Sequence, residues 1–218
     1  MKLRAIIIAP LIFITTGISN AEELVARVYG QAIYRSDISI SKADIDKWRG
    51  IKTENEIKET IKQVERIRLS QIIFDSAYSN VLGENSYKPT VQEIESLLKA
   101  LPESKVIIDI KSKMTTDQLK TADENRYKMA HQIVRSWKIN KRLYEKYDGR
   151  IAYQQAGLES IDAYILFLNE IVKNGKVEIM ISEFRSILTP TINIENQKFM
   201  SVKDAKRAFE KPWWENKK

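Results

Sequence analysis

The sequence predicts a mainly α-helical fold: a single helical domain with long amphipathic helices and a small N-terminal β-hairpin. Apolar residues recur at helical spacing along two long stretches, 54–80 and 116–147, and each stretch carries charged residues between them. The chain of 218 residues contains only 7 Gly and 5 Pro, and 30% of its residues are charged. Such a composition is typical of helices with long solvated faces rather than of flexible linkers.

The first residues have the pattern of an export signal. Lys2 and Arg4 precede an apolar run over residues 5–14, and a small-residue triplet ends at Ala21. This order predicts a signal peptide over residues 1–21, cleaved after Ala21, and a periplasmic mature chain. The alternative is a membrane anchor, but the run is shorter than the roughly 20 residues of a membrane-spanning helix and Pro10 interrupts it. We therefore expect residues 22–218 to form one domain without a transmembrane segment.

The first half of this domain is predicted to begin with a hairpin and to continue as helices. Alternating residues predict strands within 24–34 around a turn at Tyr29-Gly30-Gln31, followed by a helix start at Ser36-Asp37. The helices expected next cover 41–48, ending at Gly50; 54–80, ending by Gly83; and 91–101, between the Thr90–Glu93 capping box and Pro102.

The second half is predicted to be built on one long helix over residues 116–147. Residues 106–110 (VIIDI) before it are read as a short strand or an extended connection, because three β-branched residues stand together. The elements expected after Gly149 are a short strand over 150–153, a helix over 161–173 capped by Ser160, an extended segment over 176–181, a short helix over 182–188, and a helix from the Ser201–Asp204 capping box to Glu210.

Composition excludes several kinds of chemistry. The chain has no Cys and one His, His131, which excludes disulfides, thiolate metal sites and cysteine nucleophiles, and we expect no metal or other cofactor. His131 is interpreted as a packing residue on the long helix. Asp109, or Glu159 with Asp162, is a conceivable acid/base pair, but we do not expect an enzyme. The net charge of +7 is dispersed, so nucleic-acid binding is not expected.

The entry segment VARVYGQAIYRSDI, residues 25–38, resembles the N-terminal domains of SurA-type periplasmic foldases, the parvulin-associated chaperones. The following long helix and the stretch KPTVQEIESLL, 88–98, are also similar to that family, so the resemblance covers residues 24–101 best. Tyr29 stands where the family usually has Asn. Residues 102–218 supply the long helix and the C-terminal elements. Within them, four motifs are similar to uncharacterised exported proteins with a SurA-like N-terminal region: NKRLYEKY at 140–147, Gly149-Arg150, QQAG at 154–157 and Asp162-Ala163-Tyr164.

The resemblance implies a helical cradle that binds unfolded outer-membrane polypeptides without ATP. It does not imply prolyl isomerase activity here, because parvulin sites use His, Cys or Asp clusters and no His or Cys follows His131. Residues 150–184 are open to interpretation as a remnant of that domain. A second hypothesis is a dedicated assembly protein that binds one folded partner in a cell-envelope complex.

Aromatic and amide side chains are the candidate peptide contacts. Aromatic residues with polar tips suit a groove for varied peptides, although the same helical spacing is typical of a core. Adjacent glutamines offer donors and acceptors to a peptide backbone, or they anchor a loop. The tail with Trp213 and Trp214 either enters a membrane interface or docks against the body. The candidate peptide-binding residues are Trp137, Tyr144, Tyr147, Tyr153, Gln154, Gln155 and Tyr164.

Overall fold

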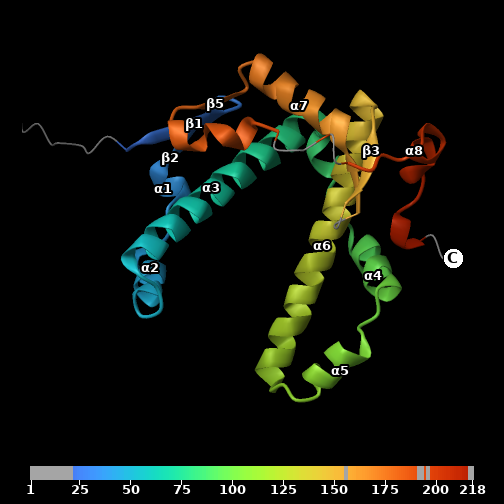
Figure 1. Cartoon of the computed structure of the whole chain (residues 1–218), viewed down its shortest axis with the longest axis horizontal. Coiled ribbons are helices and arrows are strands. Elements are labelled where there is room, and N and C mark those ends of the chain that lie inside the picture. The colour runs from blue at the N-terminus through green and yellow to red at the C-terminus, as the bar shows by residue number, and fades with distance from the viewer. Residues whose placement is uncertain (1–21, 155–156, 191–193, 195–196, 216–218) are drawn as a thin grey trace, which may run out of the picture.

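The computed structural model describes residues 22–154, 157–190, 194 and 197–215, so the predicted signal peptide and Gln155 lie outside the described residues. The chain is mainly helical with a small antiparallel sheet near its N-terminus, as the sequence predicts. Two long helices, α3 (Glu54–Tyr78) and α6 (Thr116–Tyr147), diverge from a body that contains the sheet and α7 (Ile161–Lys173) (Figure 1).

The sheet begins with the predicted hairpin. Strands β1 (Leu24–Val28) and β2 (Gln31–Tyr34) pair antiparallel, and β5 (Val177–Ile179) adds to the other edge of β1. The turn places Tyr29 at φ 49° and Gly30 at φ 83°. Two successive positive φ angles match the right-handed twist of a two-residue hairpin, so the turn forms although Tyr29 replaces Asn.

Helix starts in the first half are set by side-chain caps. The short helices are α1 (Arg35–Ile38), α2 (Lys42–Arg49) and α4 (Val91–Ala100). Thr53 and Thr90 form capping boxes with the glutamates three residues on, as the sequence predicts for Thr90. After α3 the chain continues through η1 (Ser79–Gly83) and η2 (Glu84–Ser86), and Gly83 at φ 84° ends the helical path.

The prediction for residues 106–110 is wrong, because they lie in a helix, α5 (Lys105–Lys111). The Ser104 side chain accepts a hydrogen bond from the backbone N–H of Ile107 and caps this helix. At its other end, Lys111 pairs with Asp123 of α6 at 2.5 Å and also with Glu103. These polar contacts at both ends hold a helix whose β-branched residues favour a strand.

After α6, the chain forms a second hairpin that the sequence predicts only in part. The expected strand is present as β3 (Ile151–Gln154), and β4 (Gly157–Ser160) pairs with it. Ser160 is the N-cap residue of α7, as the sequence predicts, but its side chain makes no capping hydrogen bond to the helix. Its hydroxyl donates to the carbonyl of Asn140 at 2.8 Å and so fastens β4 to α6. The remaining elements are η3 (Ser182–Leu188), α8 (Val202–Ala208) and η5 (Trp213–Glu215).

Buried apolar residues form two clusters that share α6. One cluster packs the sheet, α3, α7 and η3 around Phe167 and Phe184, with Leu143 of α6. The other packs α4, β3, β4, α8 and the tail around Trp137. Because α6 contributes residues to both clusters, it joins one cluster to the other.

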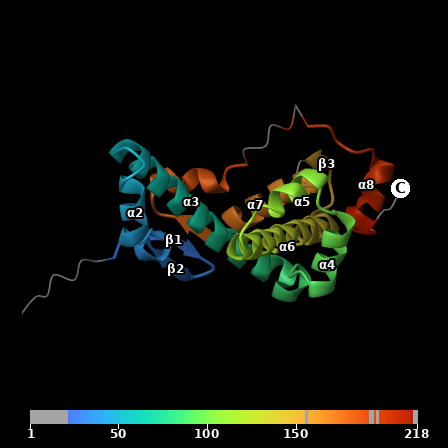
Figure 2. The same cartoon turned by 90° about the horizontal axis from the view of Figure 1, so that it is seen from below.

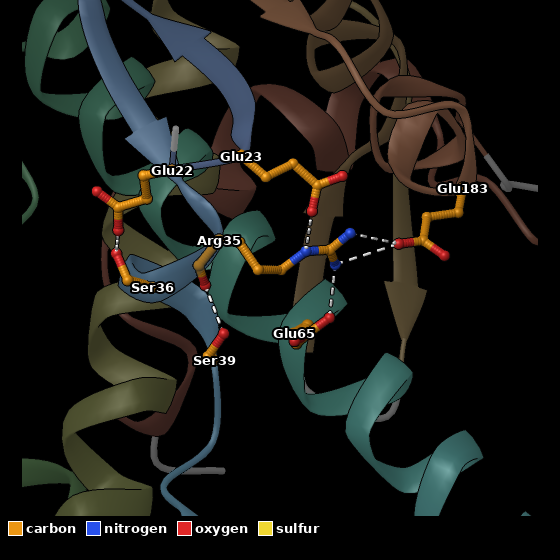
Figure 3. Close-up of polar contacts among 7 residues, drawn as sticks. All are labelled: Glu22, Glu23, Arg35, Ser36, Ser39, Glu65 and Glu183. Atoms are coloured by element: carbon orange, nitrogen blue, oxygen red, sulfur yellow. Dashed lines mark hydrogen bonds and ion pairs between the residues drawn. The ribbon is translucent and has the colours of Figure 1, made fainter. Parts of the chain in front are cut away.

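Arg35 connects three segments at the base of the sheet. Its guanidinium donates to Glu23 at 2.8 Å, to Glu65 of α3 at 2.7 Å and to Glu183 of η3 at 3.2 Å (Figure 3). It also lies 5.3 Å from the ring centre of Phe184. Hydrogen bonding to Glu23, with further contributions from the other two carboxylates, raises the pKa of Arg35. Glu65 is buried, and Arg35 neutralises its charge.

The tail docks against the body, which confirms one of the two interpretations of the sequence. Trp214 is buried, its ring centre lies 5.6 Å from that of Trp137, and the rings are nearly perpendicular. Gly157, at φ 120°, leaves room for the Trp213 indole, which would lie 3.1 Å from a Cβ at this position. The missing side chain of Gly157 is therefore what lets the tail pack against the β3–β4 hairpin.

The Trp214→Ala variant is expected to lower the free energy of unfolding by about 2 kcal/mol. This is less than for a central core tryptophan, because Trp214 stands in a segment of only three residues, whose neighbours can shift to fill part of the space. Urea unfolding followed by circular dichroism measures the loss. Trp48→Ala is the control, because Trp48 is only half-buried on α2, and its effect should be smaller. Equal effects would contradict the docked tail.

Gly149 is needed where α6 turns into β3. It has φ 112°, and a Cβ at this position would lie 2.6 Å from the Cβ of Asp162. Gly149→Ala is expected to cost about 2 kcal/mol, because it combines an unfavourable backbone angle with a clash. Gly50→Ala is the matched control: Gly50 has φ −80° and open space around it. A thermal shift of the same size for both variants would contradict this account.

Candidate functional site

Helices α4 and α5 lie beside α6 (Figure 2). Exposed apolar side chains gather between these three helices. No residue from Leu101 to Met129 is buried, although this stretch contains many apolar side chains. Ile107 is 45% exposed, Ile110 51% and Met129 66%. Contiguous exposed apolar surfaces are typical of interaction sites in proteins.

This surface is hollowed into a groove of about 420 Å³, which we call the distal groove. Its walls come from α4, the connection to α5, α5 itself and the first half of α6. The apolar residues that line it are Leu97, Leu98, Leu101, Pro102, Ile107, Ile110, Met114, Ala122, Met129, Ala130 and Ile133.

Both apolar packing and polar contacts hold the walls of the groove. Ile94 and Leu97 of α4 belong to the same buried cluster as Ala130 of α6, and polar contacts lie at the edge. Arg126 donates to the carbonyl oxygens of Leu98 and Leu101 at 3.1 and 2.9 Å, and so ties α6 to the end of α4. Lys111 ties α5 to α6 through Asp123. Because these contacts set the spacing of the helices, the apolar side chains between them stay accessible without collapsing onto one another.

The candidate peptide-binding residues lie in different parts of the structure and have different neighbours. Trp137 is buried between Phe209 and Trp214, and Tyr144 lies 5.6 Å from Phe209, so both belong to the core around the tail. Tyr147 is half-buried and donates to Glu170 at 2.7 Å. Burial, together with this hydrogen bond, raises its pKa. These three residues do not line a common groove.

The other candidates lie near the second hairpin. Tyr153 is 62% exposed on β3, and its neighbour Gln154 donates from its amide to Gln197. Tyr164 of α7 is half-buried against Phe74 and Phe167. Gln155 lies outside the described residues. None of the described candidates lines the distal groove. The groove is not predicted from the sequence, because one of its walls is the helix at 105–111, where a strand or an extended connection was expected.

A helical pattern was nevertheless present in that segment. Ile107, Ile110 and Met114 are spaced three and four residues apart, which places them on one face of a helix. Ser104 stands at the N-cap position before them. Reading these two features together, instead of the β-branched run alone, predicts the amphipathic helix that forms one wall of the groove.

The possible acid/base residues have separate environments. Asp162 accepts from the backbone N–H, Nε and Nη2 of Arg150 at 2.8–2.9 Å, and the side-chain hydrogen bonds to Arg150 lower its pKa despite partial burial. Asp109 is exposed on α5 and pairs with Lys113 at 3.1 Å. Among the residues that the structure describes, no three His, Asp or Glu side chains are placed to hold a metal ion.

Within the described ranges, no helix is both long enough and apolar enough to cross a lipid bilayer. Comparison of the chain with protein-family models, with curated proteins and with solved structures found no match. The distal groove is therefore interpreted from its own geometry.

Proposed function

We propose that this protein is an exported, ATP-independent chaperone-like protein that holds unfolded or extended polypeptides in the distal groove. The observation that carries the proposal is the stretch from Leu101 to Met129, which exposes apolar side chains on two facing helices and buries none of them. Such a surface is costly in water unless a partner covers it. An apolar segment of a polypeptide supplies that cover.

The extent of the apolar surface favours a polypeptide over a small molecule. Val106 and Ile108 are 68% and 55% exposed, and neither lines the groove. A small ligand inside the groove would leave them in water. An extended chain, at about 3.3 Å per residue, would run through the groove and reach them as well.

The side chains of the groove favour varied clients. Met114 and Met129 lie at its wall, and methionine is flexible and polarisable, so it adapts to differently shaped apolar groups. The alternative proposal, a dedicated assembly protein in the cell envelope, uses the same surface for one folded partner. A matched rigid interface would be expected to carry aromatic anchors at its centre, and the groove lining contains no aromatic residue.

The resemblance to SurA-type N-terminal domains supports the same proposal. The elements over residues 24–101 occur in the order that the family suggests: a hairpin, short helices, a long helix and a capped helix. We propose a SurA-like scaffold without isomerase activity or another catalytic role, and a periplasmic location reached through a signal peptide cleaved after Ala21.

The proposal is tested by mixing residues 22–218 with a urea-unfolded outer-membrane polypeptide and diluting the urea. Light scattering should fall to a small fraction of the value without the protein at an equimolar ratio, and adding ATP should change nothing. Unchanged scattering with several such clients would overturn the holding function. Tight, stoichiometric capture of one folded envelope protein, without suppression of aggregation, would favour the assembly protein.

A further inference from the structure

A second cavity, of about 390 Å³, lies where α6 meets the end of α3, β4 and the start of α7. Its lining includes Tyr78, Arg135, Asn140, Glu159 and Tyr164, and it shares no residue with the distal groove. Polar groups make up much of this lining. The cavity is therefore a chemically different place from the groove.

Glu159 is the unmatched charge of this cavity. Its side chain is half-buried on β4, and among the described residues it has no ion-pair or hydrogen-bond partner. Burial raises the pKa of its carboxyl group. A partly desolvated carboxylate without a partner is costly, so a cation that entered the cavity would be stabilised there.

The charged Arg135 and the amide of Asn140, which also line the cavity, already have partners. The guanidinium of Arg135 pairs with Asp75 and lies 5.3 Å from the ring centre of Tyr87. The Asn140 side chain accepts from the backbone N–H of Ser160 at 2.8 Å and donates to the carbonyl of Ser136 at 3.0 Å. The charge left uncompensated in the lining is therefore negative.

Two tyrosine side chains, Tyr78 and Tyr164, also line the cavity. Tyr164 lies near Glu159: burial, together with the charge of Glu159, raises the pKa of Tyr164 to about 12. Tyr78 adds a second phenol, whose pKa is raised by burial and by the neighbouring Tyr164. The rings of both tyrosines pack against Phe167, and phenol oxygens accept hydrogen bonds from ammonium and guanidinium groups. A carboxylate with two phenols is suited to an organic cation.

We propose that this cavity binds a basic side chain, lysine or arginine, of a bound polypeptide. Met129 lines the distal groove and Gln132 lines the cavity, and residues three apart are neighbours on the surface of a helix, so the two sites adjoin along α6. A client would place an apolar segment in the groove and a basic residue a few positions away in the cavity. Its identity as a client rests on the proposed function, whereas cation binding by the cavity does not.

The test is an NMR titration of ¹⁵N-labelled protein with N-acetyl-arginine methylamide and N-acetyl-lysine methylamide. Saturable shifts are expected for the amides of residues 135–140 and 159–164, with at least one of the two probes. Glu159→Gln should weaken binding at least about tenfold, because it removes a charge-assisted hydrogen bond. Glu95→Gln, at an exposed carboxylate of α4, is the matched control and should bind as the wild type does.

Three results would overturn the inference: no saturable shift with either cation, equal binding by Glu159→Gln, or equal binding of N-acetyl-norleucine methylamide or acetate. Native spectra away from the cavity show that Glu159→Gln is folded. The probes have no apolar segment, so they report on the cavity alone. Cation binding without polypeptide holding would refute the proposed function only, and holding without cation binding would refute the cavity inference only.

Discussion

The double variant Ile107→Asp, Met129→Glu is expected to lose most of its ability to keep an unfolded client in solution. Each substitution places a carboxylate in the wall of the distal groove, where a bound apolar segment would have to remove it from water. At a cost of about 2 kcal/mol per charge, client binding would weaken several-hundred-fold. Light scattering of a diluted, unfolded outer-membrane polypeptide measures the loss.

The two substitutions should leave stability almost unchanged, because both side chains are about half exposed or more in the free protein. Val202→Glu is the matched control. Val202 is 75% exposed on α8, away from the groove, and this variant should hold clients as well as the wild type does. The client is added at several ratios to the protein. If the double variant keeps full holding activity at every ratio, the groove is not the binding site.

The Arg35→Met variant is expected to lose about 4 kcal/mol of folding free energy. The substitution leaves Glu65 buried without its cation and removes the contacts to Glu23 and Glu183. Because Arg35 joins the sheet, α3 and η3, loss of these contacts weakens the whole body rather than one loop. Guanidinium or urea unfolding of the purified variant gives the change.

A second substitution separates the buried charge from the lost contacts. Arg35→Met combined with Glu65→Leu should recover about half of the loss, because the uncompensated carboxylate is gone. Lys62→Met is the control, since Lys62 pairs with Glu59 on the exposed face of α3 and its loss should change stability little. A similar effect of Arg35→Met and Lys62→Met would contradict the role of Arg35.

Regular periodicity and capping made most of the helical fold predictable. The helices over 54–78, 91–100, 116–147 and 161–173 end within two residues of the predicted limits, because capping residues and glycines mark those limits locally. The pairing of β5 with β1 could not be predicted from the residues of either strand, because it depends on the path of all the helices between them.

The candidate binding residues show where sequence reasoning ends. The helical spacing of Trp137 and Tyr144 is the same in a buried helix face and in an exposed one. Trp137 is buried here because the tail docks against it. Conversely, the distal groove depends on how α5 lies against α6. That arrangement comes from Lys111 and Arg126, whose partners lie 12 to 28 residues away in the chain.

The central claim is that clients lie in the distal groove, and site-specific photo-crosslinking tests it most directly. A photoreactive phenylalanine analogue is placed at position 110 in the groove wall or, as the control, at position 202. The protein is then irradiated with an unfolded outer-membrane polypeptide at an equimolar ratio. We predict strong crosslinks from position 110 and at most weak ones from position 202. Equal crosslinking from both positions, or crosslinks from position 202 alone, would contradict the account.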